Sequence, residues 1–208
     1  MVNRTFNDIE LKNRLSKLPC CSMVAFSASC AERLLPAYGR YSKQVQLDPE
    51  TSGLFDRCIE MIWSLLQSQL GETREIEEMA LACSDNIPEE EMALQAGEPY
   101  AADAATAVVF SLKALLSCEP QQAVWSARRA YDAIDNFVAV SAHSELSSSF
   151  DEDQILSHPL VQSELERQEL DLLILEGQEN GASLDEVFQR MRQKARDDAQ
   201  IFFAKSGR

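Results

Sequence analysis

Residues 101–118 read "AADAATAVVFSLKALLSC", and this stretch decides the fold class. It is apolar almost all round at helical spacing, which is typical of a helix buried on every side in a bundle. Asp103 and Lys113 interrupt the apolar run, and these charges favour a buried core helix over a membrane span. We therefore expect a central core helix over 100–118, with the other elements packed around it.

Helical patterns flank this segment on both sides. Before it, apolar residues three and four apart line one face from Cys20 to Tyr38. After it, Pro120 suits the first turn of another helix, and Ser183 with Glu186 forms a capping box for a last one. Because no stretch of useful length alternates with period two, the sequence predicts an all-α fold, a single globular bundle of about eight helices.

The domain prediction is one all-helical domain over residues 1–208. A chain of 208 residues with 45% hydrophobic content is long enough to bury one sizeable core. We expect a helical core over 8–141, an acidic Ser-rich loop over 142–157, and two C-terminal helices over 158–205 that pack on the core. The loop prediction depends on "SAHSELSSSFDED", which has no helical periodicity.

A proline lies inside one of the helical patterns, in "AERLLPAYGRY" at residues 31–41. Proline has no N–H, so a helix that continues through Pro36 deprives the carbonyl of Glu32 of its partner and bends. Alternatively the helix stops near Leu35 and Pro36 begins a new short helix. The rarity of proline in helix interiors favours the second reading, and a bend is expected in both.

The charge balance excludes some classes of partner. The formal net charge is −15, and this negative field repels nucleic-acid backbones and anionic membrane surfaces. The first residues contain no apolar segment of the kind found in signal peptides. We expect no nucleic-acid partner, no membrane association and a cytoplasmic location.

The cysteines and histidines do not predict a metal or cofactor site. The six Cys contain no CxxC pair, and the only histidines are His143 and His158. Two Glu-x-x-His motifs for a di-iron site, a Gly-rich phosphate loop and a well-placed catalytic His are all missing from the sequence. We expect no metal, no cofactor and six free thiols, mostly buried, with Cys20 and Cys21 the pair most open to oxidation.

Several short motifs together resemble the YjaG-like family of uncharacterised bacterial proteins. They are "AERLLPAYGRY" after "AFSASC", Ile62-Trp63, Ile87-Pro88, the Ala-Asp-Ala step at 102–104, and His158-Pro159-Leu160-Val161. The similarity spans nearly the whole chain and implies an all-helical cytosolic protein, without an activity. The chain departs from the family pattern at Ala37, where the family has Asn, and at Pro99-Tyr100, where the order is reversed.

The candidate site is a polar pocket of Glu32, Arg33, Tyr38, Tyr100 and Asp103. A carboxylate in the first turn of an apolar helix needs a partner if it is buried, so Asp103 is the most informative of the five. Its partner is expected to be the free N–H groups of its own helix, or an arginine such as Arg33 or Arg128. In the functional reading it converges with Glu32 and Arg33 on a cavity.

Two functions follow from these features. The first is a non-catalytic binding or self-associating module, which would form a homo-oligomer or bind a protein partner. The reason is that the helix over 54–70 has a second apolar stripe. That stripe consists of Leu54, Cys58, Met61 and Leu65. The alternative is a small-molecule-binding protein or enzyme that uses the polar cluster around Glu32, Arg33 and Asp103. We predict no catalytic residue, and the sequence favours a protein that is not an enzyme.

Overall fold

The fold is all-α, as the sequence predicts. In a computed structural model, which describes residues 3–68, 73–145, 151–177 and 182–205, the chain is 84% helical with 11 helices, 8 of them of seven residues or more. No strand occurs in those ranges. The helices are α1 (Asp8–Leu15), α2 (Cys20–Gln44), α3 (Pro49–Ser52), α4 (Leu54–Ser68), α5 (Thr73–Asp85), α6 (Glu90–Gln95), α7 (Ala101–Ser117), α8 (Pro120–Glu145), α9 (Glu152–Ser157), α10 (Pro159–Gly177) and α11 (Leu184–Lys205).

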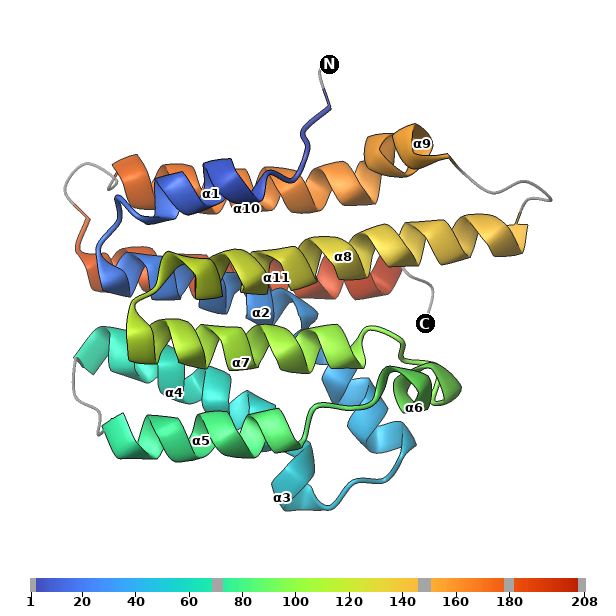
Figure 1. The fold of residues 1–208 in the computed structure, drawn as a ribbon, viewed down its shortest axis with the longest axis horizontal. Helices are drawn as coiled ribbons and strands as arrows, with labels where there is room; N and C mark the ends of the chain where they lie inside the picture. The colour runs from blue at the N-terminus through green and yellow to red at the C-terminus, as the bar shows by residue number, and fades with distance from the viewer. Residues whose placement is uncertain (1–2, 69–72, 146–150, 178–181, 206–208) are drawn as a thin grey trace.

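Two helices form the centre of the molecule. The predicted core helix, α7, packs most extensively against α2 and α8 and also touches α4, α5 and α6. In turn α2 contacts α4, α8, α10 and α11. Figure 1 shows α1 and α10 along one edge of the molecule and α4 and α5 along the opposite edge, with α2, α7, α8 and α11 between them. Side chains on α2 can therefore reach most of the other helices.

Side-chain caps start helices α3 and α11, and the capping box of α11 is one that the sequence predicts. The Asp48 carboxylate accepts hydrogen bonds from the backbone of Glu50 and Thr51 at the start of α3. Ser183 and Glu186 form the reciprocal bonds of a capping box before α11. These local bonds satisfy N–H groups that a helix start leaves without a partner.

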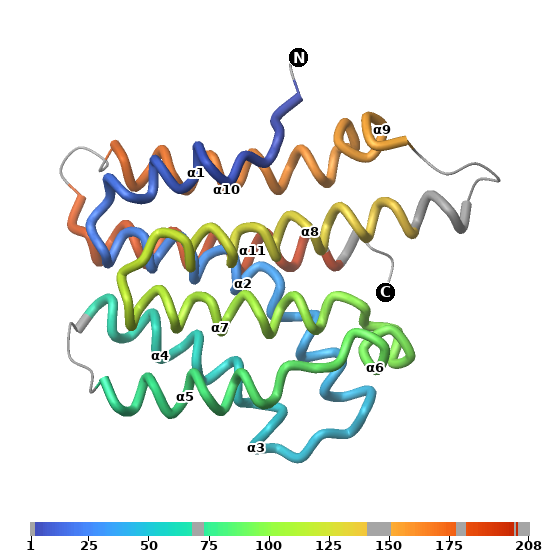
Figure 2. Tube along the Cα trace, in the orientation of Figure 1, coloured from blue at the N-terminus to red at the C-terminus, as the bar shows by residue number. Residues whose placement is uncertain are grey.

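The favoured prediction at Pro36 is wrong, because α2 continues through the proline. Residues beyond the proline, including Ala37, Tyr38 and Tyr41, are buried in the same core as Leu34 before it. Burial of these side chains outweighs the cost of an interior proline, which is about 3 kcal/mol. The trace of α2 changes direction in its second half, as the expected bend requires (Figure 2).

The predicted loop over 142–157 is too wide. The structure extends α8 to Glu145 and places α9 over Glu152–Ser157, while 146–150 lie outside the described residues. Asp151 accepts a hydrogen bond from the backbone of Gln154, whose side chain bonds back to Asp151. This capping box inside the Ser-rich and acidic stretch starts a short helix that periodicity alone does not reveal.

The prediction of six free thiols is also wrong. Cys20 at the start of α2 and Cys118 at the end of α7 form a disulfide across a sequence separation of 98. The sequence gives no sign of this bond, since only the antiparallel packing of α2 on α7 brings the two helix ends together. Four free cysteines remain: Cys21, Cys30, Cys58 and Cys83.

Candidate functional site

Glu32 and Arg33 are neighbours on α2, but they point into two different polar networks. Both side chains are nearly inaccessible, with Glu32 5% and Arg33 4% exposed. Successive helical residues are about 100° apart around the axis, so the pair faces two different sets of helices. Arg33 contacts α10, and Glu32 contacts α4 and α11.

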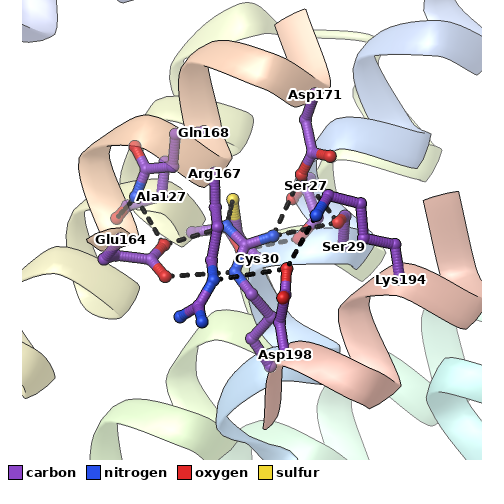
Figure 3. A network of polar contacts seen from close by, with 12 residues as sticks. Ser27, Ser29, Cys30, Ala127, Glu164, Arg167, Gln168, Asp171, Lys194 and Asp198 are labelled. Atoms are coloured by element: carbon purple, nitrogen blue, oxygen red, sulfur yellow. Dashed lines mark hydrogen bonds and ion pairs between the residues drawn. The ribbon is translucent and has the colours of Figure 1, made fainter. Parts of the chain in front are cut away.

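The first network surrounds the Arg33 guanidinium, and Figure 3 labels its partners Ser29, Cys30, Glu164 and Asp171. Its Nε and one terminal nitrogen donate to the two carboxylate oxygens of Glu164 at 3.1 and 2.8 Å. Its other terminal nitrogen donates to Asp171 and to the Ser29 hydroxyl, each at 3.0 Å. A weaker contact of 3.4 Å reaches the Cys30 sulfur. All five N–H groups of Arg33 therefore have an acceptor.

The acids of this network have further donors. Ser29 donates to Asp171 at 2.8 Å, and Gln168 donates to Glu164 at 2.9 Å and to the Ala127 carbonyl at 3.1 Å. Burial raises the pKa of Asp171, although Arg33 opposes that shift. The result is a fully bonded cluster that ties α2 to α10. Its groups are saturated by each other, which makes it a structural element and a poor candidate for ligand binding.

Burial also affects the pKa of the Cys30 thiol, which lies beside Arg33 in this network. It raises the pKa of Cys30 to about 12, even though the nearby Arg33 guanidinium acts in the opposite direction. Because the thiolate is the reactive form of cysteine, this side chain is inert at neutral pH.

The second network is built on the Glu32 carboxylate. One of its oxygens accepts from the Trp63 indole at 2.5 Å, and the other accepts from Arg196 at 2.6 Å. Arg192 forms an ion pair with Glu32 at 3.5 Å. Both arginines also bind Glu60 on α4. The distance from a terminal nitrogen of Arg196 to the Glu60 carboxylate is 2.7 Å. Burial opposes ionisation of Glu60, but the hydrogen bonds and charges of the two arginines lower its pKa.

This second network opens on a surface pocket of about 280 Å³ between α2, α4 and α11. The kink residue Pro36 forms part of its wall, and Leu35, Ile59 and Ala199 supply further apolar surface. The remaining lining residues are Glu32, Gly39, Asp56, Glu60, Arg196 and Gln200. Because Pro36 has no N–H, the Glu32 carbonyl lacks its usual helical partner at that position.

Asp56 differs from the other acids of the pocket. Within the described part of the chain, no hydrogen bond or ion pair reaches its carboxylate, whereas Glu32 and Glu60 share two arginines. Partial burial, followed by the charge of Glu60 one turn away, raises the pKa of Asp56. The pocket thus combines apolar walls with one acid that has no fixed partner.

The other predicted site residues lie elsewhere. Asp103 pairs with Arg129 on α8 at 3.1 Å, not with Arg33 or Arg128. Burial raises the pKa of Asp103 to about 6, against the effect of Arg129. Tyr38 donates to the Thr51 carbonyl at 3.2 Å, and Tyr100 packs edge-on against Phe137. Of the five predicted residues, only Glu32 lines the pocket.

Sequence reasoning missed most partners of the two networks. Asp56 and Glu60 on α4, and Arg192 and Arg196 on α11, are each four apart and so share a helix face. That spacing could have indicated two charged helix faces that pair with each other. For Arg33, the acids Glu164 and Asp171 are seven apart on α10, which also places them on one face.

A second pocket, of about 300 Å³, lies between the N-terminal segment, α1 and α10. Its principal charge, Arg14, already bonds Glu169 and Glu176. The pocket at Pro36 is lined by three helices and lies beside the buried Glu32, whereas this one is walled in part by the N-terminal segment, so the pocket at Pro36 is the stronger candidate site.

The described residues contain no group of three or more His, Cys, Asp or Glu side chains placed to hold a metal ion. In the same ranges no helix has the length and apolar character needed to cross a membrane.

Comparison with known proteins identifies the family. Residues 10–200 match the family model described as "Protein of unknown function (DUF416)". The chain belongs to the DUF416 family. No curated protein matches it. Among solved structures, it is similar to a DUF416 family protein from Shewanella baltica OS155, at 22% identity and a TM-score of 0.69. That match covers 88% of this chain and 91% of the other and supports the fold alone.

Proposed function

We propose that this DUF416 protein binds a small organic cation in the pocket at Pro36. The proposal depends mainly on Asp56, a carboxylate that lines the pocket and makes no hydrogen bond or ion pair to the described residues. Of the three carboxylates that line the pocket, Glu32 and Glu60 are paired with Arg192 and Arg196, and Asp56 is the one left for a bound cation to pair with.

The pocket walls define the rest of the ligand. Leu35, Pro36, Ile59 and Ala199 offer apolar surface. A protonated amine with a short hydrocarbon body matches these groups. The volume of about 280 Å³ is at the small end of ligand pockets.

Binding without catalysis fits the lining. The described residues that line it include no His, Cys, Ser, Thr, Lys or Tyr, so its carboxylates are the remaining groups for nucleophilic or proton-transfer chemistry. The Glu32 and Glu60 carboxylates are held by arginines, which opposes a role as general base.

The source, the cellular location and the oligomeric state are also proposals that depend on the sequence. We infer a bacterial, cytoplasmic protein of the YjaG-like type, on the evidence of the "AERLLPAYGRY" motif and the net charge of −15. Self-association is a further prediction, but the apolar stripe that suggested it has other partners: Leu54 and Cys58 are buried, and Met61 and Leu65 pack against the core. Sedimentation equilibrium measures the oligomeric state.

Isothermal titration with benzylamine and butylamine tests the proposal, with benzyl alcohol and butanol as neutral counterparts. We expect the amines to bind and the alcohols to bind at least tenfold more weakly, since only the amines pair with Asp56. The Asp56→Asn variant should lose at least tenfold in amine affinity. Asp153→Asn, which removes the same charge from an exposed position on α9, should bind as the unmodified chain does. Equal affinities for amine and alcohol, or for both variants, contradict the proposal.

A further inference from the structure

Two of the four free cysteines face each other inside the core. Cys58 on α4 and Cys83 on α5 are both 0% exposed, and their sulfur atoms are 3.0 Å apart. The two residues are 25 positions apart in the sequence, so the pair is a tertiary contact between two helices. A disulfide bond is about 2.05 Å long, which means that a shift of about 1 Å brings these sulfurs to bonding distance.

We propose that Cys58 and Cys83 are a redox-active dithiol that hydrogen peroxide converts to a second disulfide of the chain. The contact between the sulfurs supports this assignment, and the structure also distinguishes the pair from the other cysteines. Cys20 and Cys118 are already bonded, and Cys30 lies beside Arg33 in the first polar network. Among the described residues, the only contact between two free cysteine sulfurs is that of Cys58 with Cys83, so Cys21 has no such neighbour.

The reaction balances with peroxide as the oxidant. One thiol loses its proton, and the thiolate attacks a peroxide oxygen, breaking the O–O bond and leaving a sulfenic acid and water. The second sulfur then attacks the sulfenic sulfur, forming the S–S bond and releasing the hydroxyl group, which leaves as water with the second thiol proton. Two thiols and one peroxide give one disulfide and two waters, so the peroxide gains the two electrons that the sulfurs lose.

The packing of the pair controls the rate of this reaction. The hydrogen bond to Cys58, followed by burial, raises the pKa of Cys83, so little thiolate exists while the helices are packed. Hydrogen peroxide is close to water in size, and it reaches the sulfurs when α5 opens locally. Most of the packing of α5 is on α7 and little of it is on α4, so the new bond would join two helices that share few contacts.

The experiment uses the full chain and counts thiols. After exposure to hydrogen peroxide and quenching, alkylation in denaturant followed by mass spectrometry should find two modified cysteines, Cys21 and Cys30, where the untreated chain has four. Peptide mapping should find Cys58 joined to Cys83, and dithiothreitol should restore both thiols under conditions that leave the fold intact. Cys30→Ala is the matched control, since it removes a buried thiol with no cysteine partner and should give the same cross-link.

Three results overturn the proposal: four alkylated thiols after treatment, a cross-link that includes Cys21, or sulfinic acid at Cys58 or Cys83 without a cross-link. The mapping is done on the unmodified chain, so the test does not depend on whether a variant folds. Where Cys83→Ala folds, it should lose the cross-link and show sulfenic acid at Cys58 instead. Oxidation should also raise the melting temperature by several degrees, because the new bond restricts the unfolded chain.

Discussion

Glu32 and Arg33 are neighbours on α2, but the charged groups around them differ in how far they are exposed to solvent. Arg33 is enclosed by Glu164 and Asp171, whose side chains are 2% and 3% exposed. Glu32 is equally buried, but its partners Arg192 and Arg196 are 18% and 44% exposed, and Arg196 lines a pocket. One side is a closed ion-pair cluster within the core, and the other is a network that ends at solvent.

The comparison shows that burial of a charged residue does not identify a site. Arg33 has the more unusual surroundings, yet each of its donors is used within the protein. The pocket lies beside Glu32, where Pro36 interrupts the hydrogen bonding of α2 and where α11 contributes Arg196, Ala199 and Gln200 to the lining. A ligand needs groups with spare bonding capacity, and among the described residues the Glu32 side offers one in Asp56, whereas the Arg33 cluster offers none.

The largest expected effect comes from removing the centre of the closed cluster. Arg33→Met should lower the free energy of unfolding by about 3–5 kcal/mol, because it leaves two carboxylates buried without their cation. Urea denaturation at pH 7 measures the loss. The pKa of Asp171, already raised by burial, should rise further in this variant. A raised folded pKa makes ionisation costly, so the loss should be smaller near pH 4 than at pH 7.

A triple variant is the control for this result. Adding Glu164→Gln and Asp171→Asn to Arg33→Met removes the unpaired charges and should recover part of the lost stability. A loss below about 1 kcal/mol in Arg33→Met would mean that the cluster contributes no more than a surface ion pair does.

The next effect concerns the open network. Glu32→Gln should cost about 1–2 kcal/mol in the free energy of unfolding, less than Arg33→Met. Gln keeps an acceptor for the Trp63 indole, and both arginines keep Glu60 and partial access to water. Urea denaturation of Glu32→Gln and Arg33→Met under the same conditions compares their losses in free energy of unfolding directly. An equal or larger loss for Glu32→Gln would contradict the distinction between closed and open networks.

The sequence predicted the helices well and the site only in part. The all-α fold, the core helix α7 and the capping residues follow from local patterns of three to seven residues, which the sequence displays directly. The networks join α2 to α10 and α11 across more than 130 residues. Their pairing depends on how the helices pack, and packing also decides that Pro36 stays within a helix and that Cys20 meets Cys118.

Asp103 is an intermediate case, since it is buried but has only one arginine. Its pKa of about 6 lies above the ordinary value of 3.8, so its ionisation opposes folding. The penalty is absent below about pH 4, grows between pH 4 and about 6 and is constant above that. Asp103→Asn should therefore be more stable than the unmodified chain at pH 7 by about 1 kcal/mol, after allowance for the lost pair with Arg129.

Thermal or urea denaturation from pH 3.5 to pH 8 tests this prediction. The two curves of stability against pH should coincide at the acid end and separate as pH rises, whereas Asp153→Asn should run parallel to the unmodified chain. A loss of stability in Asp103→Asn at pH 7 would show that the pair with Arg129 outweighs the cost of burying the charge.

The smallest expected effect on stability is at Asp56. This side chain is only partly buried and makes no hydrogen bond or ion pair to the described residues, so Asp56→Asn should change the free energy of unfolding by no more than about 0.5 kcal/mol. The same variant should reduce amine binding at least tenfold, which separates its effect on the ligand from any effect on folding. A stability loss comparable with that of Glu32→Gln would mean that Asp56 belongs to the network that holds α4 to α11. The pocket would then have no uncommitted acid, and a cationic ligand would have no group there to pair with.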